Sequence, residues 1–196
     1  MDLTQGTQEE KHVRAKKMML WFGIISLIMS FAAWTSAFIV SSKRDDWLTQ
    51  FELPQAFFVS LIVIILSSVT IILSKRSLKK GNNSAAIVWM IITFVLGLVF
   101  VFNQIEGFNQ IIASGYHFTG ATSNITMSYI FLIAAVHIAH VVVGLICLLV
   151  VLYKLVMKKY TPKQMLGLEL AANFWHFVDL LWVYLFLFLY FFRYII

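Results

Sequence analysis

Ionisable side chains lie inside long apolar runs of this 196-residue chain, at spacings that group them on helix faces. His137 and His140 are three residues apart, as are His176 and Asp179, so each pair shares one face of a helix. At about 1.5 Å per residue, the first pair lies roughly 15–20 Å and the second roughly 10–15 Å into its run. Polar groups at such depths in a membrane are costly, so these four residues are the first candidates for a functional site.

Three kinds of chemistry fit these residues, and the sequence leaves all three open. His140 and His176 could be the two axial ligands of a haem. Asp179, His176 and Glu169 could form a proton relay. The third interpretation is a polar network between the fourth and fifth apolar segments that fixes their register, with a histidine as partner of the buried aspartate. Its expected members are His137, His140, Glu169, Trp175, His176, Asp179 and Trp182.

Other chemistries are excluded or disfavoured. A copper site lacks a third suitable ligand, and no nucleophile–base pair or glycine-rich phosphate loop is visible. The single cysteine, Cys147, cannot form a disulfide framework or a zinc site and is interpreted as a small apolar core residue. We therefore assign no catalytic residue, cofactor-binding residue or metal ligand to this chain. Gln104 and Glu106 are expected near a membrane interface, where solvated polar side chains cost little.

The elements that would position these residues are apolar runs, each long enough to cross a hydrocarbon core of about 30 Å. Each must be helical, because no other single segment satisfies its own backbone polar groups in lipid. Apolar residues make up 61% of the chain and charged residues 12%, a composition typical of a membrane protein. The sequence predicts an all-α integral membrane protein, with a polar segment at 1–17 and a membrane domain at 18–196. The five expected spans are 18–40, 54–74, 85–106, 127–153 and 169–192.

The distribution of lysine and arginine predicts the orientation. Twelve of the 15 lie in the segments 11–17, 75–80 and 154–163, and the remaining three lie at 43–44 and 193. The positive-inside rule then places the N-terminus in the cytoplasm and the C-terminus in the periplasm. This pattern explains the net charge of +6 without nucleic acid as a partner.

The segment 174–190, FWHFVDLLWVYLFLFLY, closely resembles the last helix of cytochrome c oxidase subunit III, which carries a W-H-F-V-D-x-x-W pattern. Gly167 and Glu169 match the residues that precede this helix in the family. His137 and His140 with Gly144 resemble its H-G-x-H-V-x-x-G segment.

Further matches run from Leu96-Gly97 through Phe100 to Gln104, so that the resemblance covers nearly the whole chain from about Lys16. Leu27 stands where many members carry a glutamate, so a role of that glutamate does not transfer.

The resemblance implies a short, five-helix bacterial form of subunit III in the inner membrane. It implies a non-catalytic subunit of a proton-pumping haem-copper oxidase that supports assembly, lipid binding and sustained proton uptake. Haem and copper are then expected in partner subunits and structural phospholipid on this chain. The expected partners are oxidase subunit I, other oxidase subunits and a quinol-oxidising complex in a supercomplex. The alternatives are subunit III of a quinol oxidase or of a nitric oxide reductase cluster, and an independent membrane cytochrome b.

Overall fold

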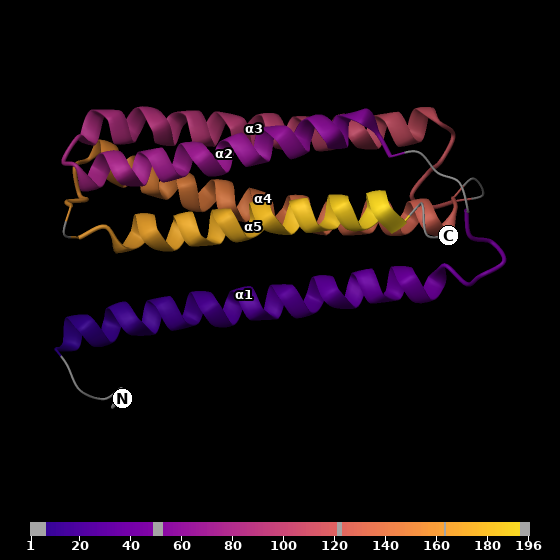
Figure 1. Ribbon diagram of the computed structural model, residues 1–196, viewed down its shortest axis with the longest axis horizontal. Coiled ribbons are helices and arrows are strands. Elements are labelled where there is room, and N and C mark those ends of the chain that lie inside the picture. Colours follow the sequence, from indigo (N-terminus) through magenta and orange to yellow (C-terminus); the bar gives the residue numbers. More distant parts are fainter. Residues whose placement is uncertain (1–6, 49–52, 121–122, 163, 193–196) are drawn as a thin grey trace.

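The computed structural model describes residues 7–48, 53–120, 123–162 and 164–192 (Figure 1). Five helices are long and apolar enough to cross a membrane, which confirms the predicted all-helical architecture. They are α1 (Gln8–Ser41), α2 (Gln55–Lys79), α3 (Asn83–Ala113), α4 (Ile125–Val156) and α5 (Leu166–Phe192). Glu52, Lys163 and Arg193 lie outside the described residues.

The helices extend beyond the apolar runs that predicted them. α1 starts at Gln8 instead of Met18, because Thr7 and Glu10 form a capping box: each side chain accepts a hydrogen bond from the other's backbone N–H. α3 continues past Glu106 to Ala113. A 34-residue helix such as α1 is about 51 Å long, so its basic first turns reach beyond the hydrocarbon core.

The turns between the helices follow from local side-chain chemistry. Asn82 caps α3 by accepting a hydrogen bond from the backbone N–H of Ala85 at 3.0 Å, and Asn124 does the same for Thr126 at 2.9 Å at the start of α4. Gly81, which ends the tight turn after α2, has a φ of 79°, a conformation that glycine adopts without steric cost. These caps allow short connections, so successive helices run antiparallel.

The helices fall into two unequal parts. α2, α3, α4 and α5 contact one another in a four-helix bundle, whereas α1 contacts only α4 and α5 (Figure 1). In the most apolar stretch of α5, 44% of the residues are buried, against 22% in α1. α1 is therefore a peripheral helix beside a closed bundle.

The side chains that attach α1 to the bundle lie in its C-terminal half. Phe38 is fully buried, and its ring packs edge-on against Phe188 and Phe192 of α5, with centroids 5.6 and 5.2 Å apart. The hydroxyl groups of Thr35 and Tyr184 lie 3.2 Å apart, which joins α1 to α5 by a hydrogen bond. In the N-terminal half, Ile24 is the only buried residue of α1.

Beyond the end of α1, a short polar loop continues this attachment. Asn124 donates a hydrogen bond from Nδ2 to the backbone oxygen of Asp46 at 3.0 Å. The guanidinium of Arg44 binds the Asp46 carboxylate at 2.8 and 3.1 Å, and this pairing lowers the pKa of that carboxyl. Both side chains are exposed, so the ion pair itself adds little stability.

The start of α1, the α2–α3 turn and the end of α4 lie at one end of the molecule (Figure 1). The three basic segments of the sequence belong to these places, so the structure gathers the positive charge at this end, which we call the basic end. The cytoplasmic location of this end stays a prediction.

Candidate functional site

The centre of the bundle is built around one tryptophan. Trp175 on α5 is fully buried, and its indole lies against Gly97 of α3 and Gly144 of α4. A Cβ atom added to Gly97 would lie 2.8 Å from Cη2 of the indole, and one added to Gly144 would lie 2.9 Å from Cε3. The indole Nε1–H donates a hydrogen bond to Oγ of Ser67 on α2 at 2.7 Å. This side chain therefore joins all four helices of the bundle, and the two glycines make the room for it.

A stripe of hydroxyl groups on α2 faces the same interior. Ser60, Ser67 and Ser74 are seven residues apart and fully buried, and Thr70 lies between them on the same face. Ser74 donates to the backbone oxygen of Ala86 at 2.8 Å, and the hydroxyls of Thr70 and Thr93 are 2.8 Å apart. Small hydroxyl side chains allow two helices to approach closely while their own polar groups stay satisfied. The stripe therefore holds α2 tightly against α3.

The histidine of the W-H-F-V-D sequence also contacts α2. His176 Nδ1 lies 2.8 Å from Oγ of Ser68, next to the serine that binds Trp175. Asp179, one turn further along α5, is 3% exposed. Ser68 lies close to its carboxyl group, but the geometry is not that of a hydrogen bond, and neither oxygen of Asp179 has a hydrogen-bond partner among the described residues.

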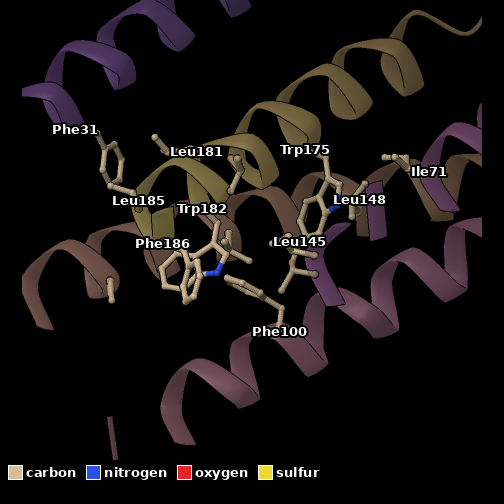
Figure 2. Packing of buried hydrophobic residues seen from close by; sticks show 14 of the residues in the cluster. Phe31, Ile71, Phe100, Leu145, Leu148, Trp175, Leu181, Trp182, Leu185 and Phe186 are labelled. Atoms are coloured by element: carbon tan, nitrogen blue, oxygen red, sulfur yellow. The ribbon is translucent and has the colours of Figure 1, made fainter. Parts of the chain in front are cut away.

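A second aromatic cluster surrounds the histidine of α4 that lies deepest in the bundle. His137 is fully buried, and its ring stacks on Trp182 of α5 with centroids 5.1 Å apart. Phe100 of α3 meets both rings edge-on, with its centroid 5.8 Å from that of His137 and 5.5 Å from that of Trp182. Figure 2 shows Phe100 beside Trp182. Neither nitrogen of His137 has a hydrogen-bond partner in the described part of the chain. His137 therefore acts in the structure as an aromatic packing residue.

The other two predicted members of the network lie towards α1. His140 Nδ1 is 2.7 Å from the backbone oxygen of Val136 in its own helix, and its ring packs against Phe31 of α1 with centroids 5.7 Å apart. Glu169, in the first turn of α5, forms an ion pair with Lys17 of α1 at 3.6 Å.

The structure corrects the geometry of the predicted polar network. The expected hydrogen bond between Asp179 and a histidine is not formed, and Trp175 and His176 bind instead to Ser67 and Ser68 of α2. His140 and His176 engage different helices, α1 and α2, which is not the arrangement of an axial pair. Within the described ranges, no three His, Cys, Asp or Glu side chains gather where they could hold a metal ion.

The two residues expected at the interface differ from each other. Gln104 is fully buried and donates from Nε2 to Oγ of Ser60 on α2 at 2.8 Å, so the prediction that it is solvated was wrong. Glu106 is exposed, and its carboxylate accepts a hydrogen bond from Asn109 at 3.3 Å. The error arose because α3 extends well beyond its apolar run, which leaves Gln104 inside the helix bundle.

Sequence reasoning missed the α2 serines as functional partners of the motif on α5. The available indication was the seven-residue repeat of Ser60, Ser67 and Ser74 within an otherwise aliphatic helix. A stripe of hydroxyls at helical spacing predicts a helix–helix contact face. It does not predict which helix the face meets.

The sequence of the chain is similar to those of known proteins. The sequence matches the family described as cytochrome c oxidase subunit III over residues 3–194. It is 34% identical over 175 residues to the probable cytochrome c oxidase subunit 3 of Mycobacterium tuberculosis, with 86% of this chain and 84% of the relative covered. It is also 32% identical over 136 residues to the cytochrome bo(3) ubiquinol oxidase subunit 3 of Pseudomonas aeruginosa, covering 69% of this chain and 63% of that protein.

Proposed function

The chain belongs to the cytochrome c oxidase subunit III family and is a subunit of a haem-copper terminal oxidase, within which we propose that it is a non-catalytic supporting subunit. In this role it binds no haem or copper, associates directly with the catalytic subunit, and helps to maintain assembly and sustained proton uptake. It is a multi-pass membrane protein, and we place it in a bacterial inner membrane with its basic end in the cytoplasm.

The observation that carries this proposal is how the residues of the W-H-F-V-D-x-x-W sequence on α5 are used. Trp175 and His176 bind serine hydroxyls of α2, and Trp182 packs on His137 and Phe100. These are contacts between helices within the chain, in a close-packed interior. In the described part of the chain, no three His, Cys, Asp or Glu side chains converge to hold a metal ion. Contacts that serve helix packing are in line with a subunit that works beside a catalytic partner.

The electron donor of the complex is proposed from the relatives. The mycobacterial protein, named as a cytochrome c oxidase subunit, shares a match that covers 86% of this chain, whereas the match to the ubiquinol oxidase subunit covers 69%. This difference in coverage favours a cytochrome c oxidase. A quinol oxidase is the second candidate. If the complex is a cytochrome c oxidase, we propose a separate quinol-oxidising complex as its partner in a supercomplex; a quinol oxidase oxidises quinol itself and needs no such partner.

The test is to purify the chain from native membranes through an N-terminal tag in a mild detergent. We expect co-purification of a large multi-span subunit, haem bands in the reduced-minus-oxidised spectrum, and oxygen uptake with reduced cytochrome c exceeding that with ubiquinol. Deletion of the chain should leave the haem spectrum of the remaining complex intact and shorten the period over which it sustains turnover. A stoichiometric loss of one haem on deletion would contradict the non-catalytic role.

A further inference from the structure

One carboxyl group is buried in the bundle without a hydrogen-bond partner. Asp179 is 3% exposed, and neither of its oxygens has a partner in the part of the chain that the structure describes. It lies about 20 Å along α5 from Leu166, the first residue of that helix. Burying an ionised carboxylate without a partner costs far more than burying the neutral acid. The protonated acid is therefore the form that this position favours.

A hydroxyl group and an imidazole lead away from this carboxyl group. Ser68 of α2 lies close to the Asp179 carboxyl, and its Oγ is 2.8 Å from Nδ1 of His176, one turn before Asp179 on α5. A serine hydroxyl can accept one hydrogen bond while it donates another, and a neutral imidazole has one donor and one acceptor nitrogen. Ser68 can therefore bridge His176 and Asp179 once the carboxyl group turns towards it.

The polar groups continue to a cavity at the basic end. This cavity has a volume of about 160 Å³ and is lined by side chains of α1, α2 and α5, among them Lys75 and Asn173. Asn173 lies one turn before His176 on α5, and the Lys75 ammonium is close enough to His176 for their charges to interact. Lys75 directly follows the apolar run of α2, at the level of lipid headgroups. A polar cavity of this size can hold water, so His176 lies between a water-accessible cavity and the buried carboxyl group.

Other ionisable groups of the helices packed on α5 are engaged elsewhere. Lys17 of α1 pairs with Glu169 at 3.6 Å in the wall of the cavity. On α4, Nδ1 of His140 is 2.7 Å from the backbone oxygen of Val136, and the ring of His137 stacks on Trp182. The route from Asp179 to the cavity therefore runs along the contact between α2 and α5.

We propose that Asp179 is a buried proton-binding site that exchanges its proton with water in the cavity through Ser68 and His176. On uptake, Ser68 gives its hydroxyl proton to a carboxylate oxygen of Asp179 and takes the Nδ1 proton of His176, while Nε2 of the ring takes a proton from water. Release runs the same steps in reverse. Each step makes one O–H or N–H bond and breaks another, so no redox partner is needed. The site uses only residues of this chain and goes beyond its proposed supporting role.

The experiment follows the carboxyl group by infrared spectroscopy of the full chain purified in detergent. The C=O stretching band of a protonated acid shifts when deuterium replaces its proton, and the band of Asp179 is identified by its loss in Asp179→Asn. We expect this band in the wild-type chain and a shift after transfer to heavy water. Ser68→Ala should slow the shift about 100-fold, the lower end of what a positioned proton-transfer group contributes. His176→Phe, which keeps an aromatic ring, should slow it similarly.

Ser60→Ala is the matched control for a loss of packing. It removes another fully buried hydroxyl of α2, the one that accepts a hydrogen bond from Gln104. Because Ser60 has no part in the proposed route, the rate of exchange at Asp179 should stay nearly unchanged.

Four results would overturn the proposal. Identical spectra of Asp179→Asn and the wild-type chain would mean that Asp179 is ionised, and a band that never shifts in heavy water would mean that the acid is sealed. Equal exchange in the wild-type chain, Ser68→Ala and His176→Phe would mean that the proton takes another route. Equal slowing in Ser60→Ala would mean that packing alone is sensed. None of these spectra involves haem, so the proposed role in an oxidase can fail while the proton site stands, and the reverse.

Discussion

Helix α1 and the four helices α2–α5 of the bundle are all apolar enough to cross a membrane, but they are held in different ways. The bundle is organised around Trp175, with glycines beside the ring and serine hydroxyls as hydrogen-bond partners. In its C-terminal half, α1 is attached through Phe38 and Thr35, and near its N-terminal end Lys17 forms an exposed ion pair with Glu169. In a bilayer, lipid tails are as apolar as leucine, so close fit and polar contacts decide how firmly a helix is held. Substitutions of the same type should therefore have different effects in the two regions.

The largest difference in stability between the two regions is expected when a glycine in each is replaced by leucine. Gly144→Leu would drive side-chain atoms into the Trp175 indole, since even a Cβ atom would lie 2.9 Å from Cε3. We expect it to destabilise the chain by about 1–3 kcal/mol, as overpacking does, and to lower the amount of assembled subunit. Gly23→Leu on α1 is the control, because the added Cβ would meet no described atom within 4 Å apart from its chain neighbours and its own helix backbone. Thermal unfolding in detergent measures both, and equal losses would remove the distinction between the regions.

A smaller effect is expected from removing the aromatic attachment of α1. Phe38→Ala leaves a cavity among Trp47, Phe188 and Phe192. We expect the free energy of unfolding to fall by about 1–2 kcal/mol. The empty cavity destabilises the chain, whereas moving a ring from the protein interior to lipid has almost no hydrophobic cost. Proteolysis of the loop after α1 should become faster while the bundle stays resistant. Phe22→Ala, at a residue 65% exposed, is the matched control, and faster cleavage there too would contradict a local role for Phe38.

Predictions from the sequence succeeded where the bilayer dictates the answer. Apolar runs longer than the hydrocarbon thickness gave five helices, because backbone groups in lipid must be satisfied within each segment. Counting residues along a helix predicts how deep a side chain lies in the membrane, but not which neighbouring helix it faces. Asp179 and His140 were therefore placed at compatible depths, yet the polar contacts of Trp175 and His176 on α5 run to α2. The peripheral position of α1 could not be predicted from the sequence either, because a helix face that meets lipid and a face that meets another helix carry the same apolar residues.

The hydrogen bond between Trp175 and Ser67 allows the strength of a polar contact in the bundle interior to be measured as a coupling energy. Ser67→Ala and Trp175→Phe each remove one partner of a buried 2.7 Å contact. A double-mutant cycle should give about 0.6–1.7 kcal/mol, which runs from the average to the largest value for hydrogen bonds between membrane helices. Ser30→Ala on α1 is the control, because its exposed hydroxyl donates to the Ser26 carbonyl of the same helix, and the substitution should be nearly neutral. A coupling near zero would mean that the shape of the indole alone positions Trp175.

The ion pair between Lys17 and Glu169 should give the smallest coupling. Its two side chains are 50% and 28% exposed and lie at the headgroup level, so water and salt screen their attraction. Lys17→Met and Glu169→Gln in a double-mutant cycle should therefore show about 0.2–1 kcal/mol at low salt and almost nothing at 1 M salt. The Trp175–Ser67 coupling, measured in the same two buffers, should not change, because it is buried and uncharged. If the ion pair kept its coupling at 1 M salt, the basic end of α1 would be held as firmly as the bundle, and α1 would no longer count as the loosely attached region.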